Sequence, residues 1–334
     1  MSFPVLSENL VDPGALDEIG AEISAVELEL TRQVRSQVRL VSSIGEHVLG
    51  AGGKRLRPAF VSLSAKAAGT DFDPVRAHKL AACMEMIHMA TLIHDDVIDH
   101  AATRRGRPTA NSEFGNTASI LTGDVLLSKA MSILAQDGDL EIIRAVSSAV
   151  VELAEGEVRE LESRDQFDLE EEEHFEILRM KTASFIQCCC EVGARVAGAA
   201  EEYRAALLKY GHHVGLAFQI VDDLLDYTGD KRQTGKPLAT DFREGCATLP
   251  LIYLRPHLAA SERDHAEEKF GNGVTDDEIR MICRWMESRG ALEKAQETAL
   301  FHVETAKASL DRLPNGPSVD LLRAAADFVV MRRS

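Results

Sequence analysis

Residues 92–109, LIHDDVIDHAATRRGRPT, carry three aspartates, Asp95, Asp96 and Asp99, at the end of an apolar segment. In a helix, residues four apart share a face, so Asp95 and Asp99 stack with Asp96 beside them. A like-charge pair at this spacing costs an exposed helix roughly 0.2–0.5 kcal/mol, and more when it is buried. Because Mg²⁺ binds one or two carboxylates together with phosphate oxygens, the pattern favours a metal site over three solvated acids.

A second stretch, FQIVDDLLDYTGD at 218–230, repeats this spacing with Asp222, Asp223 and Asp226. Gln219 comes one helical turn before Asp223, on the same face. Each cluster ends an apolar, helix-periodic segment. The repeat predicts two helices that face each other across a cavity, with carboxylates at the rim holding metal and phosphate above apolar walls.

Basic residues stand at the ends of the expected helices, near the first acidic cluster. Arg104 and Arg105 follow it directly, and GAGGKRLRP at 50–58 places Lys54 and Arg57 at a helix start. Unpaired N–H groups and the helix dipole favour phosphate at such a start. Each cation taken alone would usually be a solvated surface charge, and it is their placement at helix ends near the acids that favours a binding role. His88, two turns before Asp95, reads equally as a packed histidine or a ligand.

The apolar residues recur every three or four positions, which predicts helices and no extended sheet. We expect Asp168 to cap a helix whose first turn is Glu170–Glu173. The sequence favours one all-α domain over 1–334, with a core at about 16–256 and smaller C-terminal helices at 257–334 packed on it. Examples of segments with this helical period are 16–50, 120–136, 141–163 and 202–227.

Composition excludes several classes of protein. The 334 residues include 37 Lys and Arg against 54 Asp and Glu, a net charge of −17, which argues against nucleic-acid binding. The six cysteines contain no CxxC pair, so we interpret them as reduced core thiols. The N-terminus does not resemble a signal peptide, and no uninterrupted apolar run reaches the length of a membrane span. We therefore expect a cytoplasmic protein with no transmembrane segment.

Several motifs, taken in order, resemble those of the trans-isoprenyl diphosphate synthases. The resemblance implies an isoprenoid synthase-type helical bundle around a deep central cavity, usually as a homodimer. It also implies Mg²⁺-dependent head-to-tail condensation of isopentenyl diphosphate with an allylic prenyl diphosphate. The matching motifs are GGKRLRP (52–58), HDDVID (94–99), RR (104–105), KT (181–182), QIVDDLLD (219–226), GKP (235–237), TD (240–241) and TLP (248–250).

The resemblance also implies a role for each matching residue. The catalytic set would be Asp95, Asp96, Asp99, Lys181, Thr182, Gln219 and Asp222. Mg²⁺ would be held by Asp95, Asp96, Asp99, Asp222, Asp223 and Asp226. The allylic diphosphate would be bound by Arg104, Lys181 and Lys236, and isopentenyl diphosphate by Lys54, Arg57, His88 and Arg105. Thr182 and Gln219 would lie near the reacting carbons. One position departs from the pattern, because Cys246 stands where the family often has Lys.

This chemistry agrees with the residues. Metal and cations stabilise the departing diphosphate, so that an allylic carbocation forms. The double bond of isopentenyl diphosphate attacks it, and a proton is then lost, in the family to the departed diphosphate. An apolar pocket keeps water from the cation.

Product length is predicted from the helix that carries the first cluster. Short-chain members block the growing chain with aromatics four and five positions before the first aspartate, where this chain has the small residues Thr91 and Ala90. Ile87 lies a turn deeper, and Met131 falls where long-chain members often have a floor Phe. A turn rises about 5.4 Å, close to one isoprene unit. We therefore expect a long, quinone side-chain product, with geranylgeranyl or farnesyl length as the alternative.

Three other classes are weighed against this interpretation. A non-catalytic partner subunit of the same fold usually loses an aspartate cluster or the basic pair, whereas both clusters, Lys54 and Arg57 are intact. A terpene cyclase would not need Lys54, Arg57 and His88. A Ca²⁺-binding protein would leave the basic residues unexplained.

Overall fold

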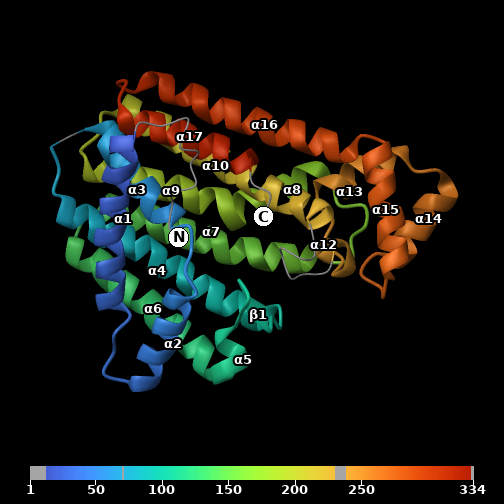
Figure 1. The fold of residues 1–334 in the computed structure, drawn as a ribbon, viewed down its shortest axis with the longest axis horizontal. Helices are drawn as coiled ribbons and strands as arrows, with labels where there is room; N and C mark the ends of the chain where they lie inside the picture. Colours follow the sequence, from blue (N-terminus) through green and yellow to red (C-terminus); the bar gives the residue numbers. More distant parts are fainter. Residues whose placement is uncertain (1–12, 70, 230–237, 332–334) are drawn as a thin grey trace. The chain divides into compact units, whose positions relative to one another are not determined.

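The computed structural model describes residues 13–69, 71–229 and 238–331, and Figure 1 shows that they are almost entirely helical. The all-α prediction is therefore confirmed. The chain divides into two compact units, which are described separately. Unit 1 comprises Met1–Val146, Cys188–Leu208 and Asp311–Ala324, and unit 2 comprises Ser147–Gln187, Lys209–Leu310 and Ala325–Ser334. A single domain over 1–334 stays a prediction.

Unit 1 begins with helices joined by short turns. Helix α4 starts where Asp73 accepts a 2.9 Å hydrogen bond from the Val75 backbone N–H, with Pro74 in the first position. The elements are α1 (Pro13–Gln33), α2 (Arg39–Gly50), α3 (Leu56–Ala68), α4 (Pro74–Ile98), β1 (Thr103–Arg104), β2 (Arg107–Pro108), α5 (Ala110–Phe114) and α6 (Asn116–Asp137).

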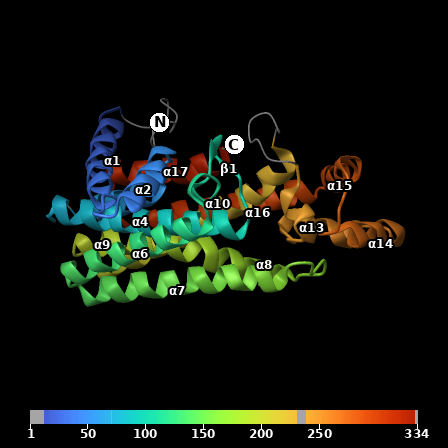
Figure 2. The same ribbon diagram turned by 90° about the horizontal axis from the view of Figure 1, so that it is seen from below.

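Helices α4 and α6 lie side by side and antiparallel (Figure 2). His94 Nε2 lies 3.2 Å from the Ile120 carbonyl oxygen at one end, and Arg76 Nε donates to Asp137 Oδ1 at 2.7 Å at the other. Between them, Cys83 Sγ donates to the Ala130 carbonyl at 3.4 Å. Within the described part of the chain, α6 is the one helix long and apolar enough to cross a membrane. It packs along α4, and part of its apolar surface, including Ile120 and Leu121, is exposed.

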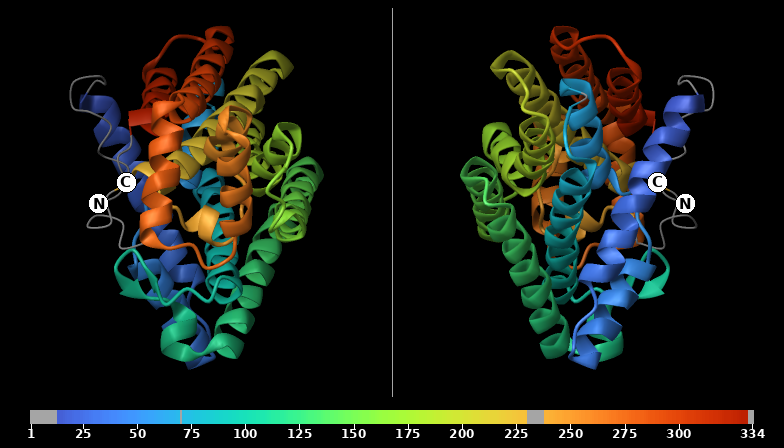
Figure 3. Two further views of the ribbon diagram at one scale, coloured as in Figure 1. Left: turned by 90° about the vertical axis from the view of Figure 1, so that its right-hand side faces the viewer. Right: turned by 90° about the vertical axis from the view of Figure 1, so that its left-hand side faces the viewer.

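Unit 2 contains the remaining helices. Figure 3 shows α14 and α15 (orange) next to each other. Arg289, at the end of α15, pairs through Nη2 with Oε1 of Glu262 on α14 at 2.7 Å. Its elements are α8 (Glu171–Leu178), the π-helix η1 (Arg179–Ala183), α12 (Thr240–Arg243), α13 (Leu249–Leu254), η2 (Arg255–His257), α14 (Ala260–Lys269), α15 (Asp276–Ser288) and α16 (Ala291–Ser309). Helices that contribute residues to both units are α7 (Leu140–Ser163), α9 (Ser184–Val196), α10 (Glu201–Thr228) and α17 (Pro317–Met331), and the short η3 (Leu310–Arg312) lies where the two units meet in sequence.

Two local predictions were wrong. The segment 16–50 is broken after Gln33, because Ser36 Oγ accepts the Val38 N–H at 3.1 Å and Ser42 Oγ accepts the Ser36 N–H at 2.8 Å. Asp168 does not cap α8, which starts at Glu171 after Glu170. Its carboxylate instead pairs with Arg263.

Candidate active site

The first aspartate cluster ends helix α4 in unit 1. Asp96 is buried, and Arg104 Nε donates to its Oδ1 at 2.7 Å. Asp95 is half-buried and Asp99 is exposed at the C-cap. The two aspartates that share a helical face are thus the more open ones, while the middle aspartate is turned toward the β1–β2 hairpin.

The β1–β2 hairpin brings both arginines to the cluster. Arg104 pairs in register with Arg107, and the turn uses Arg105 at φ 53° and Gly106 at φ 73°. The Arg105 guanidinium donates to the Gly52 carbonyl. The hairpin therefore contacts both the aspartate cluster and the GGKRLRP loop.

Arg55 holds the GGKRLRP loop in place. It has a left-handed φ of 50° and is buried, with Nη1 donating to Glu85 Oε1 at 2.8 Å. Its Nη2 also donates to the Leu49 carbonyl at 3.3 Å. Since Arg55 lies between Lys54 and Arg57, this buried ion pair fixes the loop that presents both of those cations.

A cavity of about 40 Å³ in unit 1 brings several predicted substrate-binding residues together. Burial lowers the pKa of His88 well below its ordinary value, and the positive charges of Arg57, Arg105, Arg104 and Arg55 lower it further. A neutral imidazole among four guanidinium groups suits a polyanion. The predicted residues among those that line the cavity are His88, Asp96, Arg104 and Arg105.

The second aspartate cluster occupies the last two turns of α10 in unit 2. Asp223 is buried, whereas Asp222 and Asp226 are half-buried. Asp226 Oδ2 accepts the Asp241 N–H at 2.9 Å, which ties the TD motif to the cluster. Burial, and then the charges of Asp226 and Asp223, raise the pKa of Asp241 well above its ordinary value. Sequence reasoning gave Asp241 no role.

Lys181 and Thr182 lie in the π-helical turn η1, a type of irregularity often found at functional sites. Lys181 Nζ lies 3.0 Å from Glu157 Oε2 and also pairs with Glu160, both on α7. Burial lowers the pKa of Lys181, but the two glutamates outweigh this and raise it above its ordinary value. The glutamates were missed because no local pattern connects positions 157 and 181.

Two glycines let the flanking helices approach η1 closely. A Cβ at Gly156 on α7 would lie 2.9 Å from the Lys181 backbone nitrogen, and one at Gly215 on α10 would lie 2.5 Å from Ala183 Cα. Neither distance is tolerated between a Cβ and backbone atoms. The π-helical turn is therefore held between two glycine contacts.

Gly215→Ala is expected to lower kcat by about 100-fold, because the new methyl group displaces η1 and the side chains of Lys181 and Thr182 with it. Gly20→Ala is the matched control, since a Cβ there meets nothing within 4 Å. Steady-state kinetics and thermal melting of both variants check this. Wild-type kcat in Gly215→Ala would show that the turn is held by other contacts.

The amide of Gln219 links Thr182 to the second aspartate cluster. Thr182 Oγ1 donates to Gln219 Oε1 at 2.9 Å, and Gln219 Nε2 donates to Asp223 Oδ1 at 3.2 Å. The structure thus joins two residues that the sequence placed near the reacting carbons. Among the described residues, no group of three His, Cys, Asp or Glu side chains surrounds a single metal position.

The remaining positions singled out in the sequence are Lys236, Cys246 and the residues predicted to set product length. Lys236 and the GKP motif lie outside the described residues. Burial raises the pKa of the Cys246 thiol to about 12, so the side chain that replaces Lys is neutral. Ile87 and Ala90 are buried on α4, and the half-buried Thr91 donates to the His88 carbonyl at 2.9 Å. Met131 is half-buried on α6.

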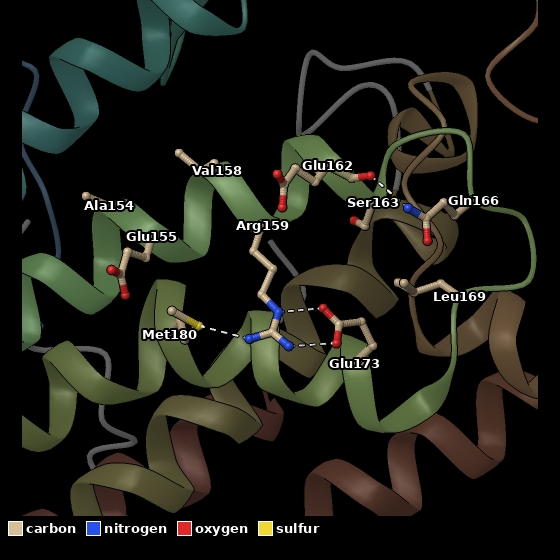
Figure 4. A pocket seen from close by; sticks show the side chains of 10 residues that line it. All are labelled: Ala154, Glu155, Val158, Arg159, Glu162, Ser163, Gln166, Leu169, Glu173 and Met180. Carbon is tan, nitrogen blue, oxygen red and sulfur yellow. Dashed lines mark hydrogen bonds and ion pairs between the residues drawn. The ribbon is translucent and has the colours of Figure 1, made fainter.

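A larger groove of about 700 Å³ lies in unit 2 between α7, α8 and η1 (Figure 4). Arg159 spans it, and its Nη2 donates to Glu173 Oε2 at 2.8 Å. None of the predicted site residues lines this groove. The candidate site is therefore not the largest of the hollows described here.

An all-helical fold with two aspartate clusters at helix ends and a basic loop beside one of them is the arrangement that the resemblance to the trans-isoprenyl diphosphate synthases implied. The polyprenyl synthetase family matches residues 38–286. The chain is 36% identical over 318 residues to an all-trans-nonaprenyl-diphosphate synthase (geranyl-diphosphate specific) from Rhodobacter capsulatus, covering 94% of this chain and 97% of that protein. It is 34% identical over 319 residues to the octaprenyl diphosphate synthase of Escherichia coli K12, covering 95% and 98%.

The fold agrees with these relationships. A polyprenyl synthase from Caulobacter crescentus CB15, solved with calcium and isoprenyl diphosphate, has a TM-score of 0.91 and 35% identity over 96% of this chain and 97% of that one. The chain belongs to the polyprenyl synthetase family, and it is a trans-prenyltransferase. The predicted fold class and enzyme class are confirmed.

Proposed function

We propose that this enzyme condenses isopentenyl diphosphate with an allylic prenyl diphosphate in a Mg²⁺-dependent reaction. Its product is a long all-trans polyprenyl diphosphate of the quinone side-chain type. The observation that carries the proposal is the pair of aspartate clusters together with the arginine- and histidine-lined cavity. The nonaprenyl and octaprenyl synthases among its relatives support the long product.

Isopentenyl diphosphate binds Lys54, Arg57, His88 and Arg105 in this proposal. The Arg55–Glu85 pair supports it by fixing the loop, and the lowered pKa of His88 supports a neutral imidazole in the site. The cations then supply charge, and the imidazole supplies a hydrogen bond.

In this proposal the allylic diphosphate binds Arg104, Lys181 and Lys236, and each of the two aspartate clusters binds Mg²⁺. The half-buried or exposed Asp95, Asp99, Asp222 and Asp226 fit a hard cation that keeps water and substrate oxygens as further ligands. Mg²⁺ would supply charge stabilisation to the leaving diphosphate. Asp96 remains with Arg104 in this arrangement.

The reaction needs no dedicated side-chain base. Lys181 and Arg104 hold the diphosphate as the allylic C–O bond breaks, and Thr182 and Gln219 lie beside the resulting carbocation. The isopentenyl double bond forms the new C–C bond, and the departed diphosphate accepts the proton. Apolar residues such as Ile87 and Ala90 line the path of the growing chain and exclude water.

We also propose that the enzyme is a cytoplasmic homodimer. One stripe of α7 supports the homodimer, because Leu140, Val151 and Val158 recur at spacings that share a helical face and are all more than half exposed. A second copy would cover such a stripe.

Incorporation of labelled isopentenyl diphosphate by the purified protein tests the proposed function. We expect product only when Mg²⁺ and an allylic diphosphate such as farnesyl diphosphate are both present, and none when EDTA is added. Tight binding of Ca²⁺ or of either diphosphate with no product from geranyl, farnesyl or geranylgeranyl diphosphate would contradict it.

A further inference from the structure

His174 is a buried histidine to which the proposed reaction gives no task. It lies on α8 with 4% of its surface exposed, and its Nε2 is 3.2 Å from Asp223 Oδ2. Asp223 is equally inaccessible, at 5% exposure. A buried polar pair of this kind carries a desolvation cost, so its partners and their orientation matter.

The two oxygens of the Asp223 carboxylate face two different groups. Oδ2 faces His174, and Oδ1 accepts from the Gln219 amide nitrogen at 3.2 Å. Because a carboxylate can only accept, it holds the NH₂ end of the Gln219 amide toward itself. The carbonyl end must then point the other way.

The same orientation reaches Thr182. The Gln219 carbonyl accepts the Thr182 hydroxyl at 2.9 Å, so that hydroxyl is committed as a donor. The lone pairs of the Thr182 hydroxyl oxygen can then face another group. Lone pairs beside an allylic carbon stabilise the positive charge that develops when the diphosphate departs.

We propose that His174 is a positioning residue that anchors Asp223 and thereby sets the direction of the hydrogen-bond chain Asp223–Gln219–Thr182. The inference rests on the proposed function and extends it, because it names what orients the groups beside the carbocation. It also gives Asp223 a structural partner in place of the metal that its motif suggests. Removal of His174 should therefore affect carbocation formation and leave the affinity for Mg²⁺ unchanged.

The test compares His174→Phe with His174→Gln, whose amide nitrogen can take the place of Nε2. We expect His174→Phe to lower kcat by about 10–100-fold, the range typical of residues that orient a functional group. The Mg²⁺ concentration at half-maximal rate and the KM for isopentenyl diphosphate should stay at wild-type values, and His174→Gln should recover most of the rate. His78→Phe is the matched control, because it removes another histidine–carboxylate pair, in which Nε2 lies 2.6 Å from Glu22 Oε2.

A second readout does not depend on turnover. The Gln219 side-chain NH₂ resonance, identified by its loss in Gln219→Leu, should shift in His174→Phe and return in His174→Gln. An unshifted resonance, a kcat within about threefold of wild type, or a raised Mg²⁺ requirement in His174→Phe would overturn the inference. A wild-type protein that makes no product would overturn the proposed function instead, and the resonance would still decide whether His174 orients the amide.

Discussion

Asp222→Ala is expected to lower kcat by at least about 10³-fold, because it removes a carboxylate proposed to hold Mg²⁺ on the leaving diphosphate. Metal stabilisation of developing charge contributes several kcal/mol, and about 4 kcal/mol corresponds to three powers of ten in rate. The Mg²⁺ concentration for half-maximal rate should rise as well. Both quantities come from rates measured over a series of Mg²⁺ concentrations.

The matched control for this prediction is Asp277→Ala. Asp277 also belongs to a run of acids on a helix, but its side chain is 91% exposed at the start of α15. Its kinetics should match those of the wild type. If Asp222→Ala kept its rate and its Mg²⁺ requirement, the second aspartate cluster would not be part of the metal site.

Ala90→Phe is expected to shorten the product by several isoprene units. The aromatic ring would stand on α4 one turn from His94, at the position where the family resemblance implies that short-chain members block the growing chain. Mass spectrometry of the product checks this, with thermal melting to show that the buried substitution leaves the protein folded. A product of wild-type length from folded Ala90→Phe would show that the chain does not pass this residue.

A substitution at Met131 tests the same prediction at a second position, because its product length can be compared with that of Ala90→Phe. The hydrogen bond from Cys83 to Ala130 places Met131 near the level of Cys83, seven residues below Ala90 on α4. Seven residues of helix span about 10.5 Å, or about two isoprene units. Met131→Phe should therefore give a product about two units longer than that of Ala90→Phe.

Local periodicity was enough to predict the helices that carry the two aspartate clusters. The 3.6-residue repeat placed both aspartate clusters at helix ends, as α4 and α10 show. It also explains why the middle aspartates differ from their neighbours, since Asp96 and Asp223 lie about 100° around the helix from Asp95 and Asp222. Those two are the buried ones.

Contacts between distant segments could not be predicted in this way. His174 meets Asp223 across 49 positions, and Glu157 meets Lys181 across 24. No sequence spacing encodes such pairs, because they depend on how helices pack. The π-helical turn is likewise hidden, and its close contacts with Gly156 and Gly215 join segments that are far apart in the sequence. Asp168 was predicted to cap α8 because aspartate is a good capping residue. It pairs instead with Arg263, which is 95 positions away in the sequence.

The most direct test of the account is the chain length of the product that the wild-type enzyme makes from farnesyl diphosphate, isopentenyl diphosphate and Mg²⁺. Mass spectrometry should find one dominant polyprenyl diphosphate with a chain length in the heptaprenyl to decaprenyl range. A product that stops after a single addition would contradict the long-chain assignment while keeping the enzyme class. The absence of any condensation product would contradict the proposed reaction itself.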